Sequence, residues 1–597
     1  LPWSIWATME KLRMLEMGTV VMGGGIALAP HSGNHHGLFS KAFLHAKLIP
    51  QPRKNRYARA MSTASLSPTA MRARPKLSLR RLVAWVYARA VDPGSGTWFV
   101  IGFAAAHAVL WTLILVNLKA AQDVHMDVAE AFAWGQQLQF GYGKHPPLSG
   151  WVAGLWFKLF PVRDWPTYAL AMAVLATGMV ISWFTALRVV DRRRAFFVVV
   201  MLAIYPIFNF KGFKYNPDLL QLVTLPLVVL AYLNAFEKRD VKSGVWLGLA
   251  GALALLTKYW VLTMIGAIGL AALIHPERLR FLSSPAPWVA IATLVVAMTP
   301  HLVWLKQVDF VPFTYAGDVY GHVTREMAVD LAIGYVGHNL ALLALPIVLA
   351  LLALCIGRRW WSLAAVTART WARGPNPGVN TAQALNVWII QAIVAIGPPL
   401  GALFFVVYLK TDWGISLFFL VPLALLALPV LRLRRFTLFN IVAIWLVATL
   451  ATWVASPWIA VQEMIQNSAG PAPYVARSEL ARELTQAWHT RFDGRWAVVV
   501  GNMDVAEPLA FYSPDHPAPF THGEAWSAGL TSLAEAKRLG FIGVCDTATT
   551  WNLPACEQWM AQNAANAARI VMTTQRFYRG HPGPSRKWNV YIVPPAR

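Results

Sequence analysis

Long apolar runs separated by short polar connections occupy most of the chain between residues 97 and 458. Most of them approach the roughly 20 residues that an α-helix needs to cross about 30 Å of hydrocarbon. The runs lie at 97–118, 167–190, 195–210, 217–236, 243–258, 259–274, 286–305, 327–356, 384–409, 414–431 and 436–458. This pattern predicts a polytopic α-helical membrane protein with about 11–13 transmembrane helices, in a membrane domain at 76–459.

The pattern changes after about residue 460, where charged and polar residues return. Strand-like runs occur at 495–502, 540–546 and 588–595, with helical patterns at 477–490 and 531–539. Strands that alternate with helices predict a small α/β domain over 460–597. Cys545 and Cys556 both fall in this domain and are expected to pair if it lies in an oxidising compartment.

The composition agrees with a membrane protein, since 57% of the 597 residues are hydrophobic and only 13% are charged. A formal net charge of +24 could also suit a nucleic-acid partner, but the basic residues cluster between apolar runs. These clusters are 80–89, 191–194, 237–242, 275–280, 357–360 and 432–435. Basic loops stay cytoplasmic, so the other loops and the tail are expected outside. The C-terminal domain is therefore expected outside the membrane, which in a Gram-negative host would be the periplasmic side of the inner membrane, and no nucleic-acid partner is expected.

Residues 1–75 fit neither pattern, because they are basic and rich in Ser and Pro without the features of a signal peptide. They are expected to form a disordered cytoplasmic arm. Alternatively, part of this segment is an upstream extension of the reading frame, with Met61 as the natural start.

Lys258 interrupts an otherwise apolar stretch, Gly248–Ile274. Basic loops flank the stretch on both sides, so it must cross the membrane twice, and about 16 helical residues rise only about 24 Å before Lys258. Lys258 is therefore expected at the turn of a short hairpin, at the outer membrane surface. A lone lysine there could simply extend its side chain to the interface.

Other ionisable residues accompany Lys258 at the predicted outer boundary. They are Asp127, Glu130, Lys144, His145, Lys211, Lys214, Asp218, His301 and Asp412. Charge at membrane depth is costly and usually marks a functional site. Cations beside carboxylates suit a phosphate carried on a lipid, with an acid or base working next to it.

The first outer loop, 119–166, carries two of these carboxylates. Asp127 and Glu130 are three residues apart, so a helix would place them on one side. Alternatively, Asp127 is only an N-cap and Glu130 completes a capping box. The following segment, GYGKHPPL, is expected to end the helix and to present Lys144 and His145 from a stiff turn.

Four segments, MDVAEAFAWG, KHPPLSGW, NPDLLQLVTLPLVVLAYLNAFEK and WLGLAGALALLTKYW, resemble the GT-C class of membrane glycosyltransferases. The resemblance is to the bacterial branch related to protein O-mannosyltransferases and lipid A aminoarabinose transferases, and it covers roughly residues 97–597. It implies a GT-C fold and the transfer of one sugar from a polyprenyl-phosphate monosaccharide. The acceptor would be lipid A, lipopolysaccharide core, another envelope lipid or a protein, on the outer side.

The resemblance also implies roles for three residues. Asp127 matches the acidic residue that acts as a catalytic or orienting carboxylate, and Lys258 matches a lysine that contacts the donor phosphate. Asp218 matches the aspartate of the third segment. The family commonly has Glu-Lys before the Pro pair, whereas this chain has Lys144-His145. Either Lys144 replaces the phosphate-binding lysine, or His145 makes a pH-dependent contact.

The chemistry of such a site assigns further roles. Lys258 and Lys144, with Lys211 or Lys214 as supplements, would stabilise the negative charge of the leaving polyprenyl phosphate. Asp127, with Glu130 beside it, would deprotonate or orient the acceptor, and a direct displacement would invert the anomeric centre. Asp412 or Lys410 is expected to contact the donor sugar.

A divalent metal is not expected to be required. Asp127, Glu130, His145 and His301 could form a site, but the sequence has no local metal-binding spacing.

Two other functions remain open. A transporter or lipid-linked sugar flippase would predict inverted halves, but the long first loop has no later counterpart. A non-catalytic membrane scaffold would leave the one-sided cluster of charges unexplained.

Overall fold

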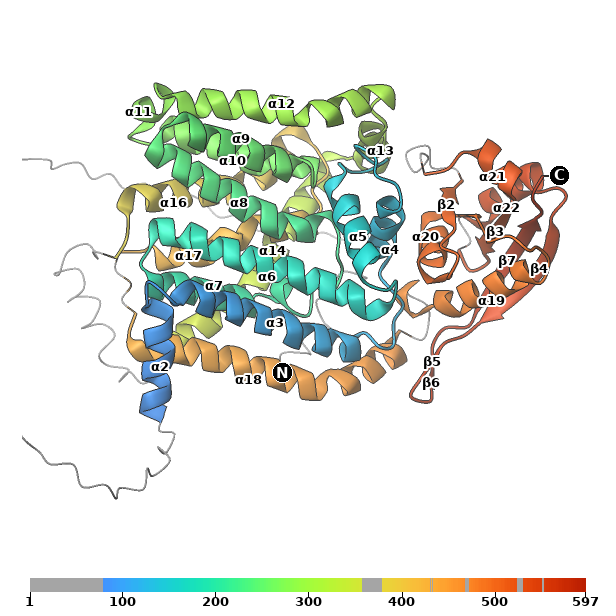
Figure 1. Ribbon diagram of the computed structural model, residues 1–597, viewed down its shortest axis with the longest axis horizontal. Helices are drawn as coiled ribbons and strands as arrows, with labels where there is room; N and C mark the ends of the chain where they lie inside the picture. The colour runs from blue at the N-terminus through green and yellow to red at the C-terminus, as the bar shows by residue number, and fades with distance from the viewer. Residues whose placement is uncertain are drawn as a thin grey trace, which may run out of the picture. The chain divides into compact units, whose positions relative to one another are not determined.

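The computed structural model describes residues 79–356, 378–429, 431, 433–467, 472–522, 530–549 and 552–596. The predicted N-terminal arm lies outside the described residues. The first part of the described chain is helical (Figure 1). Its helices are α2 (Leu79–Val91), α3 (Gly96–Leu118), α4 (Met126–Gly135), α5 (Leu148–Leu159), α6 (Asp164–Val189), α7 (Arg192–Ile204), η1 (Pro206–Phe208), α8 (Pro217–Lys238), α9 (Val241–Leu255), η2 (Tyr259–Val261), α10 (Leu262–Ile274), α11 (Arg278–Leu282), α12 (Pro285–Gln307), α13 (Val311–Tyr320), α14 (Arg325–Cys355), α16 (Thr381–Phe405), η3 (Thr411–Leu420), α17 (Val421–Leu426) and α18 (Arg435–Gln466).

Seven helices in the described part of the chain are long and apolar enough to cross a membrane, by length and composition. They are α3, α6, α8, α12, α14, α16 and α18. Val241–Leu255, Tyr259–Ile274 and Thr411–Leu426 are shorter apolar helical stretches. These elements, together with α7, coincide with all the predicted apolar runs, so the prediction of a polytopic α-helical membrane protein is confirmed.

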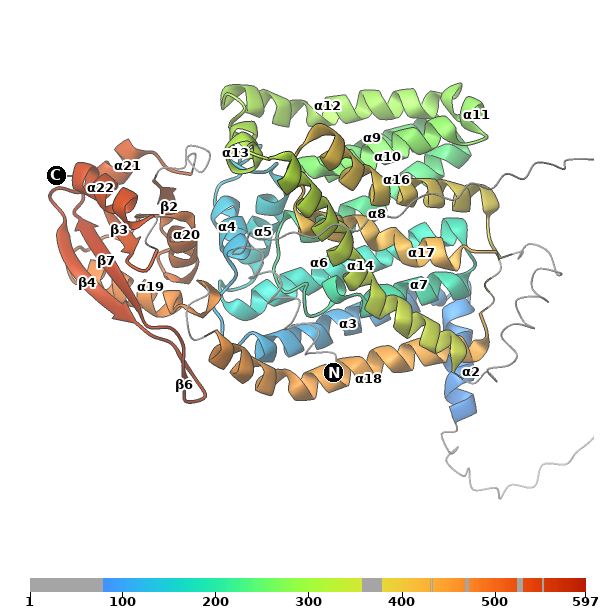
Figure 2. The same ribbon diagram turned by 180° about the vertical axis from the view of Figure 1, so that it is seen from behind.

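The long helices run side by side, with α12 and α18 along opposite edges in both views (Figure 1, Figure 2). Both edge helices expose apolar side chains, such as Val296 and Val454. In contrast, most of α8 is buried among its neighbours. Apolar side chains at the edge are stable only against an apolar solvent, which is the arrangement expected of a bundle in lipid.

The apolar stretch around Lys258 is broken as predicted. α9 ends at Leu255, and Lys258 has an extended backbone, with φ of −165°, before η2 and α10. A lysine at the interruption between two short helices agrees with the expected hairpin.

The C-terminal region is an α/β domain, as predicted. Its elements are η4 (Ala472–Tyr474), α19 (Arg477–His489), β1 (Val498–Gly501), α20 (Met503–Tyr512), β2 (Ala518–Thr521), α21 (Leu533–Leu539), β3 (Phe541–Asp546), α22 (Leu553–Asn563), β4 (Ala568–Thr574), β5 (Phe577–Tyr578), β6 (His581–Pro582) and β7 (Arg586–Val593). The sheet has the order β2-β1-β3-β7-β4, and β7 is antiparallel to both neighbours. One core packs against α19 and α20, and a second against α21 and α22. The predicted Cys545–Cys556 disulfide is confirmed and joins β3 to α22.

A buried polar junction connects this domain to the segment that follows α3. The carboxylate of Asp123 is fully buried, forms an ion pair with Arg576 and accepts the backbone N–H of Arg477 at 2.8 Å. The hydroxyl of Tyr512 accepts the Val124 N–H and donates to Asp164, both at 2.6 Å. These bonds hold the C-terminal domain against the first loop, directly beside α4.

Candidate active site

The first loop folds into two short helices, α4 and α5, beside α20 (Figure 1). The N-cap of α4 is His125, whose Nδ1 accepts the Asp127 N–H at 3.2 Å. The capping-box interpretation is therefore wrong, because the imidazole takes the capping position and the carboxylate of Asp127 stays available for other partners. Asp127 and Glu130 are both on α4 as expected, but they contact different sets of residues.

The segment between α4 and α5 forms the predicted stiff turn. α4 and α5 pack so closely that a Cβ on Gly135 would lie 2.5 Å from the backbone N of Gly154. The Tyr142 N–H donates to the His145 carbonyl at 2.9 Å and closes the turn. Next, the Leu148 N–H donates to the Leu256 carbonyl at 2.9 Å. This last bond ties the turn that carries His145 to the hairpin that carries Lys258.

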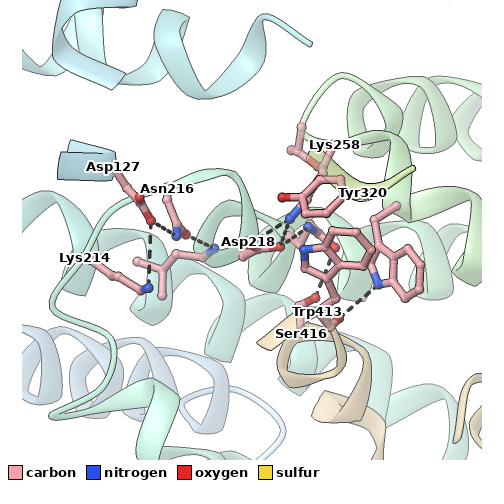
Figure 3. Close-up of polar contacts among 12 residues, drawn as sticks. Asp127, Lys214, Asn216, Asp218, Lys258, Tyr320, Trp413 and Ser416 are labelled. Carbon is pink, nitrogen blue, oxygen red and sulfur yellow. Dashed lines mark hydrogen bonds and ion pairs between the residues drawn. The ribbon is translucent and has the colours of Figure 1, made fainter. Parts of the chain in front are cut away.

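Asp127 contacts three side chains from two parts of the chain, and Figure 3 shows two of them, Lys214 and Asn216. Its Oδ2 accepts Asn216 Nδ2 at 2.8 Å and lies 3.9 Å from Lys214 Nζ, and its Oδ1 lies 3.6 Å from His125 Nδ1. Burial opposes ionisation, but His125, Lys214 and Asn216 outweigh it and lower the pKa of Asp127. The carboxylate is therefore ionised at neutral pH.

The N-terminus of α8 contacts both Asp127 and Lys258. Asn216 is the N-cap of α8, and its Oδ1 accepts the Leu219 N–H at 2.9 Å. This bond orients the amide so that Nδ2 faces Asp127. Asp218 follows two residues later in the first turn of α8 and points to Lys258 (Figure 3).

Lys258 forms an ion pair with Asp218. Its Nζ lies 2.8 Å and 2.9 Å from the two carboxylate oxygens, and Gln221 donates to Asp218 Oδ1 at 3.1 Å. The ring of Trp413 lies 5.3 Å from Lys258 Nζ and is oriented by Trp260, whose Nε1 donates to the Trp413 carbonyl at 3.0 Å. The carboxylate and the aromatic ring fix the position of the Lys258 ammonium, so it does not extend freely to the interface.

Aromatic rings continue from Trp413 over the Lys258 region. Tyr320, at the end of α13, meets Trp413 edge-on at 5.3 Å and Tyr408 at 4.8 Å. The end of α13 therefore contributes to an aromatic wall beside Lys258 (Figure 3).

The charges of Lys258, Lys144 and Asp127 all act on the imidazole of His145. Burial, followed by the positive charges of Lys258 and Lys144, holds the pKa of His145 well below its usual value. Asp127 acts in the opposite direction on the same ring. The imidazole is neutral at pH 7, so it contributes a hydrogen-bonding group rather than a fixed cation.

Glu130 and Lys144 form a second cluster together with the C-terminal domain. The two side chains are an ion pair, and Lys144 Nζ lies 2.9 Å from the sulfur of Met503 in α20. Burial lowers the pKa of Lys144, but Glu130 and Glu507 outweigh it, so the pKa is raised. Glu507 was not predicted from the sequence. Its position inside an ordinary amphipathic helix of another domain carries no signal of a site.

Three other predicted residues, Lys211, Asp412 and His301, have contacts with residues outside these two clusters. Lys211 is in the turn before α8, where its N–H donates to the Pro206 carbonyl. Asp412 Oδ1 lies 3.4 Å from His338 Nε2, and His301 contacts the Tyr259 hydroxyl at 3.0 Å. The substrate-binding roles of Lys211 and Asp412 stay predictions. Within the described ranges, no group of three His, Cys, Asp or Glu side chains could hold a metal ion.

Comparison with known proteins shows which folds and sequences resemble this chain. The profile of the dolichyl-phosphate-mannose-protein mannosyltransferase family matches residues 144–304. The crystal structure of ArnT from Cupriavidus metallidurans bound to undecaprenyl phosphate has a TM-score of 0.52 at 13% identity, covering 83% of this chain and 98% of that chain. Its apo state gives the same score and identity over 84% and 98%. At this identity the likeness shows a shared fold, and together with the profile match and a curated relative it supports a membrane glycosyltransferase of the GT-C class.

A particular relative is the lipid A galacturonosyltransferase RgtD of Rhizobium johnstonii. It is 26% identical to this chain over 231 residues, which are 38% of this chain and 47% of the relative. The chain thus matches about half the length of that curated relative.

Proposed function

We propose that the protein transfers a single sugar from a polyprenyl-phosphate monosaccharide to an envelope acceptor at the periplasmic surface of a bacterial inner membrane. One observation carries the proposal. The N-terminus of α8 holds an ionised carboxylate, Asp127, through Asn216, and a charged lysine, Lys258, through Asp218. The proposed base and the proposed phosphate-binding cation are thereby both anchored to one helix end, although they come from other segments.

The donor phosphate would bind beside Lys258 and His145, with Lys144 on one side and Lys214 on the other and Lys211 as a supplement. The first turn of α8 adds the positive end of a helix dipole. Fixed cations at this position stabilise the charge that develops on the departing phosphate. Polyprenyl phosphate thereby becomes a good leaving group.

Asp127 would act on the acceptor. If the nucleophile is a hydroxyl of lipid A, core sugar or protein, Asp127 accepts its proton while the new C1–O bond forms and the C1–O bond to phosphate breaks. If the nucleophile is a phosphate, Asp127 only orients it. With one carboxylate and no covalent intermediate, the product has inverted anomeric configuration. The lipid A acceptor in the name of RgtD and the undecaprenyl phosphate bound in the ArnT crystal structure support these partner classes.

The test uses the purified full chain, an undecaprenyl-phosphate sugar and a lipid A acceptor. Asp127→Asn and Lys258→Ala should each lower kcat/KM about 100-fold or more, the magnitude typical of a lost catalytic base or charge-stabilising group. Lys242→Ala, an exposed lysine at the opposite end of α9, is the matched control and should retain activity. Normal turnover in both site variants would contradict the catalytic assignment, and a product of retained configuration by NMR would exclude direct displacement.

A further inference from the structure

A cavity lies beside the phosphate-binding region, between the first loop, the end of α12 and the C-terminal domain. Its empty volume is about 630 Å³, which includes the solvent at its open mouth. Its lining includes Glu130, Trp134, Tyr142, Lys144, Trp304 and Glu507. Lys144, one of the lysines proposed to bind the donor phosphate, also lines this cavity, so the cavity adjoins the proposed phosphate site.

The walls of the cavity are rigid aromatic rings. Trp134 and Tyr142 stack with centroids 5.1 Å apart and an interplanar angle of 5°. The Tyr142 hydroxyl is held by the Gln137 carbonyl at 2.8 Å. A Cβ on Gly141 would lie 2.2 Å from the ring of Trp304, so this residue must be glycine for the ring to pack. Flat aromatic walls with a few polar groups between them suit the C–H surface and hydroxyl groups of a sugar ring.

The charged side chains that line the cavity have a net negative charge. Its three charged side chains are Glu130, Glu507 and Lys144, so two carboxylates accompany one ammonium. Lys144 is engaged by Glu130 in an ion pair and also feels the charge of Glu507. All three are buried, where charges interact strongly because water screens them little. A ring with its own carboxylate would therefore meet net repulsion, whereas a neutral or amino-substituted ring would not.

We propose that this cavity binds a neutral or amino-substituted pyranose ring and rejects a uronate, and that Glu507 of the C-terminal domain determines this specificity. The inference rests on the proposed function and deepens it by naming the charge class of the sugar. The same ring chemistry can come from the donor or from a sugar of the acceptor. Glu507 is a positioning and specificity residue here, supplied by a domain that holds none of the predicted catalytic residues.

The experiment measures kcat/KM of the full chain with three undecaprenyl-phosphate donors, which carry a neutral hexose, an amino sugar and a uronic acid. The wild type should prefer the neutral or amino sugar over the uronate by about tenfold or more. Glu507→Gln keeps the shape of the side chain and brings the lining to zero net charge, and Glu507→Lys makes it positive. The preference should shrink in the first variant and shrink further or reverse in the second. Glu535→Lys, on the exposed side of α21, is the matched control.

A second arm keeps one neutral donor and compares an acceptor whose sugars are uncharged with one that carries a uronate. If Glu507→Lys changes discrimination among donors, the ring in the cavity belongs to the donor, and if it changes discrimination among acceptors, the ring belongs to the acceptor. Either result supports the inference. A folded, active Glu507→Gln enzyme with unchanged discrimination in both arms overturns it, as does a wild-type preference for uronates in both arms. Failure of every donor in the wild type refutes the proposed function instead.

Discussion

Asn216 bonds to Asp127 and to its own helix at the same time. Its Nδ2 lies 2.8 Å from Asp127 Oδ2, and its Oδ1 lies 2.9 Å from the Leu219 N–H. The orientation of the predicted base therefore depends on a helix cap. Asn216 opens the NPD segment, but the sequence does not mark it as a site residue, because an N-cap asparagine before a proline is typical of any helix start.

Asn216→Ser should separate the two roles. Serine caps a helix about as well as asparagine, so the thermal stability should stay within about 0.5 kcal/mol of the wild type. Serine cannot place an N–H donor on Asp127, so kcat should fall about tenfold or more. Asn216→Ala should additionally destabilise the protein by about 1 kcal/mol. The measurements are kcat and the melting temperature in detergent.

Asn380→Ser is the matched control for this prediction. Asn380 is the N-cap of α16 and accepts the Gln383 N–H, but it lies outside the candidate site. Its substitution should leave kcat unchanged. Full activity in Asn216→Ser would show that Asp127 does not need this hydrogen bond.

His145 should make stability depend on pH. Burial and the charges of Lys258 and Lys144 hold its pKa well below the value of about 6.5 that histidine has in an unfolded chain. As the pH falls below 6.5, the unfolded chain binds a proton that native His145 does not bind. The free energy of unfolding should therefore decrease toward acid pH, by at most about 1.4 kcal/mol per pH unit from this group.

The check compares melting temperatures of the wild type and His145→Gln between pH 7.5 and 5. The variant should lose less stability toward acid pH than the wild type. His322→Gln, exposed between α13 and α14, is the control and should follow the wild type. Parallel curves for the wild type and His145→Gln would contradict the lowered pKa.

The buried pair Asp123–Arg576 should be important for holding the C-terminal domain on the first loop. Asp123→Leu leaves the Arg576 guanidinium buried beside fewer partners, and removal of one member of a buried pair costs about 3–5 kcal/mol. Replacement of both residues, as Asp123→Leu with Arg576→Met, should recover a large part of that loss. Thermal unfolding of the four proteins of the double-mutant cycle measures it.

An exposed ion pair is the control for this cycle. Removal of the Glu535–Arg538 pair of α21 should change stability by less than about 1 kcal/mol. An equal loss of stability at both pairs would contradict the prediction that the buried Asp123–Arg576 pair costs more to break than an exposed pair.

The disulfide should stabilise the C-terminal domain. Cys545 and Cys556 are separated by 11 residues in sequence, and closing a loop of about this length stabilises by about 3 kcal/mol in the chain-entropy description. Cys545→Ser, or reduction with dithiothreitol, should lower the melting temperature of the purified chain, whereas Cys355→Ser should not. Equal melting temperatures with and without reductant would contradict the prediction.

The pattern of hydrophobic residues predicted most helices and several strands, because side-chain hydrophobicity and the period of a helix or strand are local properties of the sequence. The apolar runs coincide with helices, and the three predicted strands correspond to β1, β3 and β7. The strands β2 and β4 were missed, since β2 contains a proline and β4 alternates between exposed and partly buried positions. The helix α18 contains the apolar run at 436–458 and continues beyond it to Gln466.

The sequence by itself determined the membrane class, the interruption at Lys258 and the types of charged residues near the outer boundary. Only the tertiary structure decided the partners of these charges. It paired Lys258 with Asp218, placed His125 rather than Asp127 at the cap of α4, and brought Glu507 from a distant domain to Lys144. The physical reason is that an element forms from neighbours along the chain, whereas an ion pair forms between side chains that meet only after the helices have packed.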